Sequence, residues 1–460
     1  MSPTPGGRRL ATVTIPAPDL RPEPFLRHAA GEARGFWARG ERWVAHRGVA
    51  AEHAGGGDPG RDRFDDVAAW ARGLVRDPLL PPGATRAPRV RFYGGFSFRT
   101  DHAPREAWEP FPAALFHVPA FELEGDGSGD AWLRARALVP PEDAEEALAR
   151  LRRHAEALRA ELTSLSDGEG AHPRTLPARL ASTERDAWEA AVAETLEAIA
   201  QRRVSKVVLA RTLDVEVDVD AADVVARLWE VNRGSHVFLF EPKAGAALVG
   251  AAPETVATLR DGVFHATAVA GSIRRGDSPR EQAELAARLL ASEKDRHEQR
   301  IALDDMVARL ETVAHQIRTD PQPHVLTLAR IQHLETEIRA SVPAGTGVLD
   351  LVRLLHPTAA VCGLPRDAAL AFLAEEEPFD RGWYAGPVGW LDAEGNGVFA
   401  PALRCAVRRG GTWRLFAGAG IVDGSVPSSE WEETGMKFTP VLEALAASGA
   451  LLPEAVGERP

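Results

Sequence analysis

Lysine is nearly absent from this chain. Its 460 residues include 54 Lys and Arg, and only Lys206, Lys243, Lys294 and Lys437 are lysine, which leaves 50 arginines. An arginine side chain stays charged at ordinary pH, whereas a lysine amine can be held neutral and can then accept a proton. High-GC codon usage would explain the bias without any physical cause, so scarcity alone assigns no role. It does mark four positions at which proton abstraction by an amine is chemically accessible.

Cysteine and long apolar runs are also scarce. Two cysteines, Cys362 and Cys405, exclude a four-thiolate metal site and allow one disulfide at most, so we expect reduced, packed thiols. The first twelve residues lack the apolar segment of a secretion signal, and no uninterrupted run of about 18 apolar residues occurs. We therefore expect a cytoplasmic protein without a membrane partner.

An excess of positive charge is missing as well. The formal net charge is −12 and the isoelectric point is near 5.7, whereas binding to a phosphate backbone depends on clustered positive charge. We therefore expect no nucleic-acid partner. An anionic ligand would have to be held by a few local cations, either side chains or a bound metal.

The order of the expected elements favours an α+β fold with antiparallel sheets. Residues 1–88 are rich in Pro, Gly and Arg and contain little that can be assigned, and residues 448–460 are expected to be a tail. Between them, alternating stretches predict strands in blocks, for example over residues 89–98, 132–139 and 204–217. Periodic stretches predict helices over residues 140–163, 183–202, 279–318 and 427–447. Blocks of strands and helices, rather than strict alternation, argue against a doubly wound parallel sheet.

Two titratable residues are candidates for acid–base chemistry. Lys206 begins the apolar stretch K-V-V-L-A-R, where a strand would bury alternate side chains, and burial disfavours a charged amine. Its alternative is a lysine at a strand end that extends into solvent. Glu254 follows Pro253 in G-A-A-P-E, where partial burial would favour its protonated form. The alternative is a turn glutamate that points into water.

Two acidic helices are candidates for a metal site. Asp295 and Glu298 are three residues apart, Glu430 and Glu433 repeat that spacing, and each pair therefore shares a helix face. Oxygen ligands of this kind suit Mg²⁺, which commonly takes one or two carboxylates together with waters and substrate oxygens. The alternative is a solvated face on each helix, with an ordinary ion pair between Glu433 and Lys437.

A small-residue segment and a buried arginine complete the candidates. Gly418-Ala419-Gly420 could form a loop whose backbone N–H groups face a carboxylate, although a hairpin bulge would have the same sequence. Arg404 lies in a stretch that otherwise looks buried, where a guanidinium generally has an anion beside it. That anion could be a ligand or a neighbouring glutamate.

Taken in order, these stretches resemble the chorismate-utilising enzyme family, which includes isochorismate, salicylate, anthranilate and aminodeoxychorismate synthases. The resemblance runs from about residue 90 to residue 445. Its most specific parts are K-V-V-L-A-R (206–211), G-A-A-P-E (250–254), A-V-A-G-S (268–272), S-E-K-D-R-H-E (292–298), H-P-T-A-A-V-C-G (356–363), Y-A-G-P-V-G-W (384–390), A-L-R (402–404) and the segment from A-G-A-G-I-V to E-W-E-E-T-G-M-K (417–437).

The resemblance implies a fold, a reaction and a set of site residues. The fold would be one large α+β domain of two antiparallel sheets flanked by helices, with residues 1–88 as its variable part and residues 89–447 as its catalytic part. The reaction would be the Mg²⁺-dependent conversion of chorismate to isochorismate, because the family's isochorismate and salicylate branches carry lysine at position 206. Lys206 would be the base and Glu254 the acid. Glu298 and Glu433, with Asp295 and Glu430 nearby, would hold Mg²⁺. The substrate-binding residues would be Gly271, Ser272, His356, Tyr384, Arg404, Gly418, Gly420 and Lys437.

Departures from the family pattern and rival activities remain. Gln299, Ala252, Ala359 and Val269 replace residues that are common in the family, and none of them is a proposed ligand, base or acid. The rivals are a salicylate synthase, which would go on to eliminate pyruvate, and a non-catalytic binding subunit. We expect a monomer or weak homodimer that supplies menaquinone or siderophore synthesis.

Overall fold

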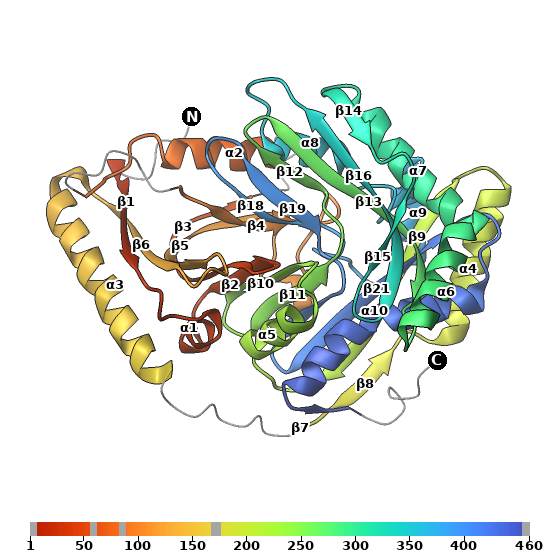
Figure 1. Ribbon diagram of the computed structural model, residues 1–460, viewed down its shortest axis with the longest axis horizontal. Helices are drawn as coiled ribbons and strands as arrows, with labels where there is room; N and C mark the ends of the chain where they lie inside the picture. The colour runs from red at the N-terminus through yellow and green to blue at the C-terminus, as the bar shows by residue number, and fades with distance from the viewer. Residues whose placement is uncertain (1–6, 56–61, 82–88, 167–175, 453–460) are drawn as a thin grey trace.

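The computed structural model describes residues 7–55, 62–81, 89–166 and 176–452. Its helices are α1 (Pro22–His28), α2 (Arg63–Leu74), α3 (Ala144–Ser166), α4 (Arg185–Ala200), α5 (Ala221–Val231), α6 (Pro279–Ala291), α7 (Glu293–Leu310), α8 (Val348–Leu355), α9 (Arg366–Glu376) and α10 (Pro427–Ala447). Figure 1 shows α3 at one end of the molecule and α6, α7 and α9 at the other.

Twenty strands of the described chain join through antiparallel pairing into one network, whose two arms meet at β3 (Arg42–Gly55) and β5 (Ala114–Gly125). The first arm continues from β3 through β2 (Arg34–Arg39), β10 (His236–Lys243), β11 (Ala246–Ala252), β20 (Cys405–Arg409), β21 (Thr412–Ile421) and β9 (Lys206–Glu216), and ends on β8 (Arg179–Ser182) and β17 (Gly363–Leu364).

The second arm starts from the other edge of β5. It runs through β4 (Phe92–Phe96), β18 (Pro387–Leu391), β19 (Gly397–Pro401), β12 (Ala257–Arg260), β13 (Val263–Arg274) and β16 (Ile331–Ser341), with β14 (His315–Thr319) and β15 (His324–Thr327) on the far edge of β16. A further branch from β5 consists of β6 (Ala131–Val139) and β1 (Arg9–Pro16). A separate parallel pair joins β7 (Leu176–Pro177) to β22 (Ala450–Leu451).

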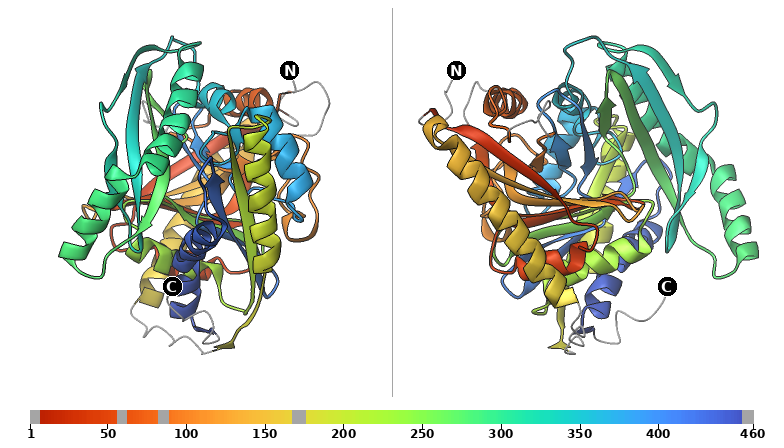
Figure 2. Two further views of the ribbon diagram at one scale, coloured as in Figure 1. Left: turned by 90° about the vertical axis from the view of Figure 1, so that its right-hand side faces the viewer. Right: turned by 60° about the vertical axis from the view of Figure 1, so that its left-hand side comes forward.

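The predicted α+β class with antiparallel pairing is confirmed. The two sheets that were expected correspond to the two arms, which are continuous through β3 and β5. Helix α7 packs on β13 and β16 of the second arm, whereas α10 packs on β21 of the first. Figure 2 shows these helices and strands from the sides. The two acidic helices are therefore carried by different arms.

One predicted helix is two helices. The stretch expected to be helical over residues 279–318 forms α6 and α7, and Ser292 between them has an extended backbone with ψ 117°. The Ser292 hydroxyl accepts a hydrogen bond from the backbone N–H of Asp295 at 3.2 Å, as an N-cap serine does. The helical periodicity of the sequence continues across Ser292 and therefore does not reveal the boundary. The boundary is marked by the N-cap at Ser292, after which α7 begins. Residues 315–319 form β14 instead of helix.

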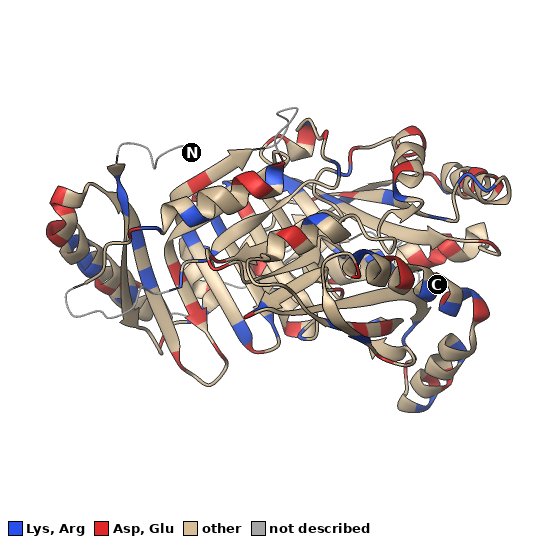
Figure 3. Ribbon diagram, turned by 90° about the horizontal axis from the view of Figure 1, so that it is seen from above, with Lys and Arg blue, Asp and Glu red and all other residues tan. Residues whose placement is uncertain are grey.

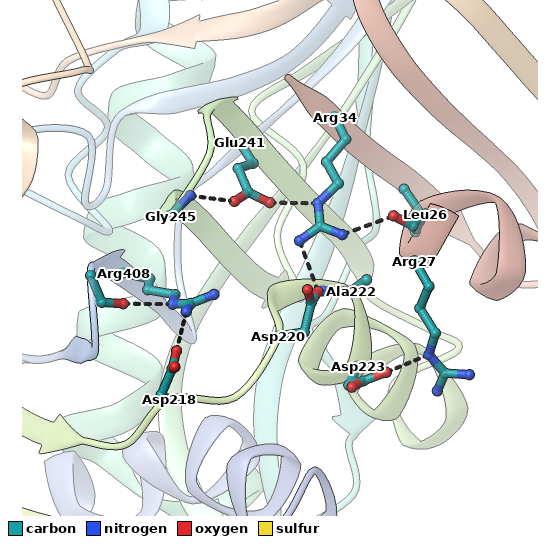
Figure 4. Close-up of polar contacts among 11 residues, drawn as sticks. Leu26, Arg27, Arg34, Asp218, Asp220, Ala222, Asp223, Glu241, Gly245 and Arg408 are labelled. Atoms are coloured by element: carbon teal, nitrogen blue, oxygen red, sulfur yellow. Dashed lines mark hydrogen bonds and ion pairs between the residues drawn. The ribbon is translucent and has the colours of Figure 1, made fainter. Parts of the chain in front are cut away.

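The N-terminal segment, which the sequence left unassigned, is tied into the first arm by a buried arginine. Arg34 on β2 donates to Glu241 on β10 at 2.6 Å, to Asp220 at the start of α5 at 2.8 Å, and to the carbonyl of Leu26 in α1 at 2.8 Å (Figure 4). The Arg34 and Glu241 side chains are only 2% and 3% exposed. Removal of one member would leave the other as an uncompensated buried charge.

Charged residues of both signs are distributed together, and both cysteines are buried. Figure 3 shows basic and acidic residues mixed along the same helices and strands. Cys362 and Cys405 are buried and free, so the prediction of packed thiols is confirmed. Among the helices of the described residues, none combines the length and apolar character needed to cross a membrane.

Candidate active site

A pocket lies between the two arms. The first arm contributes Val208 of β9 and Phe416 of β21, and the second contributes Val269 of β13. Ten of the predicted site residues line it: Glu254, Gly271, Ser272, Glu298, Tyr384, Arg404, Gly418, Gly420, Glu433 and Lys437.

Lys206 lies beneath the pocket wall. It is the first residue of β9, its side chain is 0% exposed, and its Nζ lies 3.0 Å from Oε1 of Glu298, which lines the pocket. That contact is an ion pair without hydrogen-bond alignment, and Nζ has no hydrogen-bond partner in the described chain. The amine is therefore buried next to the pocket with unused hydrogen-bonding capacity, and it does not extend into solvent.

Glu254 is a buried acid. It follows β11 and is 2% exposed, so the alternative of a turn glutamate in water does not hold. Burial raises the pKa of Glu254 to about 8, against a lowering by the charge of Lys206 and a further raising by Glu335. Its Oε1 has no hydrogen-bond partner in the described residues. At neutral pH the Glu254 side chain is a carboxylic acid that can donate a proton.

The acidic helices carry ion pairs that use three of the four lysines. Lys206 pairs with Glu298 at 3.0 Å, Lys294 with Glu430 at 2.8 Å, and Lys437 with Glu433 at 2.6 Å. The fourth lysine, Lys243, is exposed at the end of β10. The scarce residue type is therefore concentrated around one set of carboxylates.

These ion pairs affect the charge of the carboxylate cluster, which consists of Asp295, Glu298, Glu430 and Glu433. Burial alone would raise the pKa of Glu433, but the charges of Lys437 and Lys294 outweigh burial and lower it to about 2. Burial and the neighbouring charge of Glu433 raise the pKa of Glu430. Burial is also the main cause of the raised pKa of Asp295. The pKa of Glu433 therefore shifts down, whereas the pKa values of Glu430 and Asp295 shift up.

The glycines make room for side chains. Gly418 and Gly420 lie within β21, paired with Ala210 and Val208 of β9, so the expected loop or bulge is corrected to a continuous strand. A Cβ on Gly420 would lie 2.1 Å from Oε1 of Glu298. Glycine at position 420 therefore leaves the space that the Glu298 carboxylate occupies.

The bulge occurs on β13 instead. The pairing of β13 with β16 shifts between Ala270 and Ser272, and Gly271, which the shift skips, has a positive φ of 74°. This backbone conformation favours glycine, and the shift places Gly271 and Ser272 at the pocket.

Arg404 supplies an incompletely used buried cation. It has a positive φ of 48°, its NH2 donates to Nε2 of His333 at 2.8 Å, and its NH1 has no partner in the described chain. Burial lowers the pKa of Arg404 to about 10, which leaves it protonated at neutral pH. Because Nε2 of His333 accepts this bond, the neutral ring carries its proton on Nδ1, 3.1 Å from the carbonyl of Gly271. A neighbouring glutamate was one of the two anions considered for Arg404. In the described residues Arg404 makes no hydrogen bond to a glutamate.

Residues on β9 and β21 fix the walls. The phenol ring of Tyr384 stacks on Phe416 with centroids 4.9 Å apart. Arg211, five residues after Lys206, stacks on the Trp431 ring at 3.6 Å and donates to the Thr434 hydroxyl at 2.7 Å. Arg211 therefore holds α10 against the strand that carries Lys206.

Four of the predicted site residues do not line the pocket: Lys206, Asp295, Glu430 and His356. Lys206 contacts a residue that does, and Glu430 pairs with Lys294 behind the wall. His356 is buried with its Nε2 3.0 Å from the carbonyl oxygen of Phe98, so it packs in the core and does not reach the pocket. Sequence reasoning missed His333, which lies in a stretch without a distinctive motif, and the part played by Lys294.

Comparisons with known proteins identify the family of the chain. The sequence profile described as "Chorismate binding enzyme" matches residues 4–446. The chain belongs to the chorismate-binding enzyme family. The family resemblance expected from the sequence is confirmed, and it extends into the N-terminal segment.

Relatives within the chorismate-binding family cover most of the chain. The chain is 35% identical over 426 residues to the salicylate biosynthesis isochorismate synthase of Pseudomonas aeruginosa, which covers 90% of this chain and 85% of that protein. It is 32% identical over 355 residues to the isochorismate synthase MenF of Bacillus subtilis, covering 77% and 74%. The solved structure of MenF, the menaquinone-specific isochorismate synthase from Escherichia coli, matches with a TM-score of 0.76, 26% identity and 95% coverage of both chains.

Proposed function

We propose that this protein is an isochorismate synthase, an isomerase that converts chorismate to isochorismate. The observation that carries the proposal is a buried carboxylic acid, Glu254, that lines the pocket, together with a buried amine, Lys206, that contacts the pocket residue Glu298. A hydroxyl transfer of this type needs a base to activate water and an acid to protonate the departing hydroxyl. The named relatives that cover most of the chain support the same reaction class.

The proposed step balances within the pocket. In its deprotonated form, Lys206 takes a proton from water as the water oxygen bonds to C2 of chorismate. The ring double bonds shift, the C4–O bond breaks, and Glu254 gives its proton to the departing hydroxyl, which leaves as water. Lys206 is then protonated and Glu254 ionised, and proton exchange with solvent restores both groups.

The substrate is a dianion, and the pocket offers fixed donors to its carboxylates. The free NH1 of Arg404 and the ammonium of Lys437 line the pocket, with the Tyr384 hydroxyl beside Gly418. We assign these three groups to carboxylate binding, because the two cations form the stronger hydrogen bonds to carboxylates and the hydroxyl is a further donor. The amides around Gly271 and Ser272 remain candidates for the same role.

Mg²⁺ fits the carboxylates of the pocket. Glu298 and Glu433 both line it, and each has one oxygen paired with a lysine and a second available. Hard oxygen donors suit Mg²⁺, which keeps waters and takes substrate oxygens. In the described residues no group of three or more Asp, Glu, His or Cys is arranged to hold a metal by itself, so two carboxylates are the protein's share. When bound, the ion would supply positive charge toward a substrate carboxylate.

Product analysis tests the proposal. Purified protein, incubated with chorismate and Mg²⁺, should form isochorismate, identified by chromatography. Fluorescent salicylate with pyruvate would indicate a salicylate synthase, anthranilate in the presence of ammonia would contradict the role of Lys206, and unchanged chorismate would indicate a binding subunit.

Lys206 variants test the base. Lys206→Ala and Lys206→Arg should each lose about 10²–10⁴-fold in kcat, because a guanidinium keeps the charge and cannot accept the proton. Lys243→Ala, at the exposed lysine, is the matched control and should keep wild-type turnover. Wild-type rates in either Lys206 variant would refute the assignment.

Cytoplasmic location, the monomeric or weakly dimeric state and the choice between menaquinone and siderophore supply stay predictions.

A further inference from the structure

The proposed reaction leaves one lysine of the site without a role. Lys206 is the proposed base and Lys437 binds substrate, whereas Lys294 does neither. Lys294 lies in the first turn of α7, and its Nζ reaches across to Oε1 of Glu430 on α10 at 2.8 Å. The Lys294 side chain is 29% exposed and that of Glu430 only 2%. The pair links the two helices that carry the metal candidates.

Lys294 is also the cation shared by most of the cluster. Besides Glu430, the carboxylates of Glu298 and Glu433 act electrostatically on its ammonium. Glu298 lies four residues after it on α7, and Glu433 lies three residues after Glu430 on α10, so these side chains converge from neighbouring helix positions. A positive charge therefore lies among these carboxylates.

All three glutamates pair with a lysine, and they differ in whether they also line the pocket. Glu298 and Glu433 line the pocket, whereas Glu430 does not and is engaged by Lys294. A free carboxylate at position 430 would add negative charge to the cluster and offer a further oxygen ligand. The ammonium of Lys294 cancels that charge and occupies that oxygen.

We propose that Lys294 is a built-in counter-cation that withholds Glu430 from the metal and lowers the affinity of the site for Mg²⁺. This inference rests on the metal site of the proposed function. Lys294 is a positioning residue, because it acts on the ion through Glu430 and the neighbouring carboxylates. Like charges repel even in water, so the ammonium opposes any divalent cation in the cluster.

Calorimetric titration with Mg²⁺ in the absence of chorismate tests the inference. Lys294→Gln should bind Mg²⁺ about tenfold more tightly than wild type, a change of about 1.4 kcal/mol. Lys294→Arg keeps the charge and should bind as wild type does. Lys243→Gln removes the exposed lysine outside the site and should also match wild type.

A charge-matched double variant separates this effect from misfolding. Lys294→Gln leaves Glu430 buried without its partner, whereas Lys294→Gln combined with Glu430→Gln removes both charges. The double variant should return to within about threefold of the wild-type Mg²⁺ affinity, because the net charge of the cluster is restored. A thermal melt of each variant reports folding.

The outcomes distinguish this inference from the proposed function. Equal or weaker Mg²⁺ binding by folded Lys294→Gln overturns the counter-cation role, even if wild type makes isochorismate. A tenfold gain that persists in the double variant overturns the role of Glu430. Wild-type protein that makes isochorismate but binds no Mg²⁺ overturns the metal site and this inference, and leaves the reaction assignment standing.

Discussion

Replacement of Glu254 by glutamine should abolish turnover and stabilise the fold at the same time. The pKa of Glu254 is raised to about 8 by burial, so the group is about 90% protonated at pH 7 and about 10% protonated at pH 9. If the protonated form is the catalytic acid, kcat/KM should fall about tenfold between these pH values. The glutamine variant has no proton to give at any pH.

The stability effect has the opposite sign. The folded-state pKa of about 8 lies above the ordinary value of 4.5, so the contribution of Glu254 to stability is fully present below pH 4.5 and is lost as pH rises through about 8. At pH 7.5 the ionisation available to the unfolded chain costs the folded state about 4 kcal/mol relative to a side chain that stays neutral. Glu254→Gln removes that cost, so the variant should unfold at a higher temperature than wild type at pH 7.5 and above.

Two measurements on the same samples check this reasoning. Initial rates of chorismate consumption from pH 6 to 10 report the acid, and thermal unfolding over the same range reports the linkage. A flat wild-type rate between pH 7 and 9, or a glutamine variant that is active or less stable than wild type at pH 8, would refute the assignment of a buried, protonated Glu254.

Three further predictions address space, structure and accessibility. Gly420→Ala places a Cβ 2.1 Å from the Glu298 carboxylate and should lower kcat/KM roughly 10²-fold with little change in the melting temperature, as steady-state kinetics and a thermal melt would show. Arg34→Met should destabilise the fold by about 3–5 kcal/mol in urea unfolding, whereas Arg27→Met, at an exposed ion pair, should cost less than about 1 kcal/mol; equal losses would contradict the buried network. Amine-reactive labelling followed by peptide mass spectrometry should modify Lys243 before Lys206, and the reverse order would contradict the burial of Lys206.

The sequence was sufficient for features that depend on local pattern. The strand beginning near residue 204, the helix over residues 427–447 and the α+β class were all predictable, because each depends on periodicity within one stretch. The motif residues were also found one by one, and ten of them meet at the pocket.

Features that depend on contacts between distant residues were not predictable. The pairing of Lys294 with Glu430 joins residues 136 positions apart, and in S-E-K-D the lysine looks like part of a solvated helix face. His333 is held by contacts with Arg404, 71 residues away, and with Gly271, 62 residues away. In both cases the deciding partner comes from another helix or strand, which a single stretch of sequence does not contain.

The two arms are joined through β2 and β3, which belong to the N-terminal segment that the sequence left unassigned. Within the described residues, the strand pairing that connects the strand of Lys206 to the strand of Gly271 runs through β2, β3 and β5. None of these strands supplies a group to the pocket. Changes in residues 34–55 can therefore alter catalysis without touching a reacting atom, by shifting one half of the reaction chamber relative to the other.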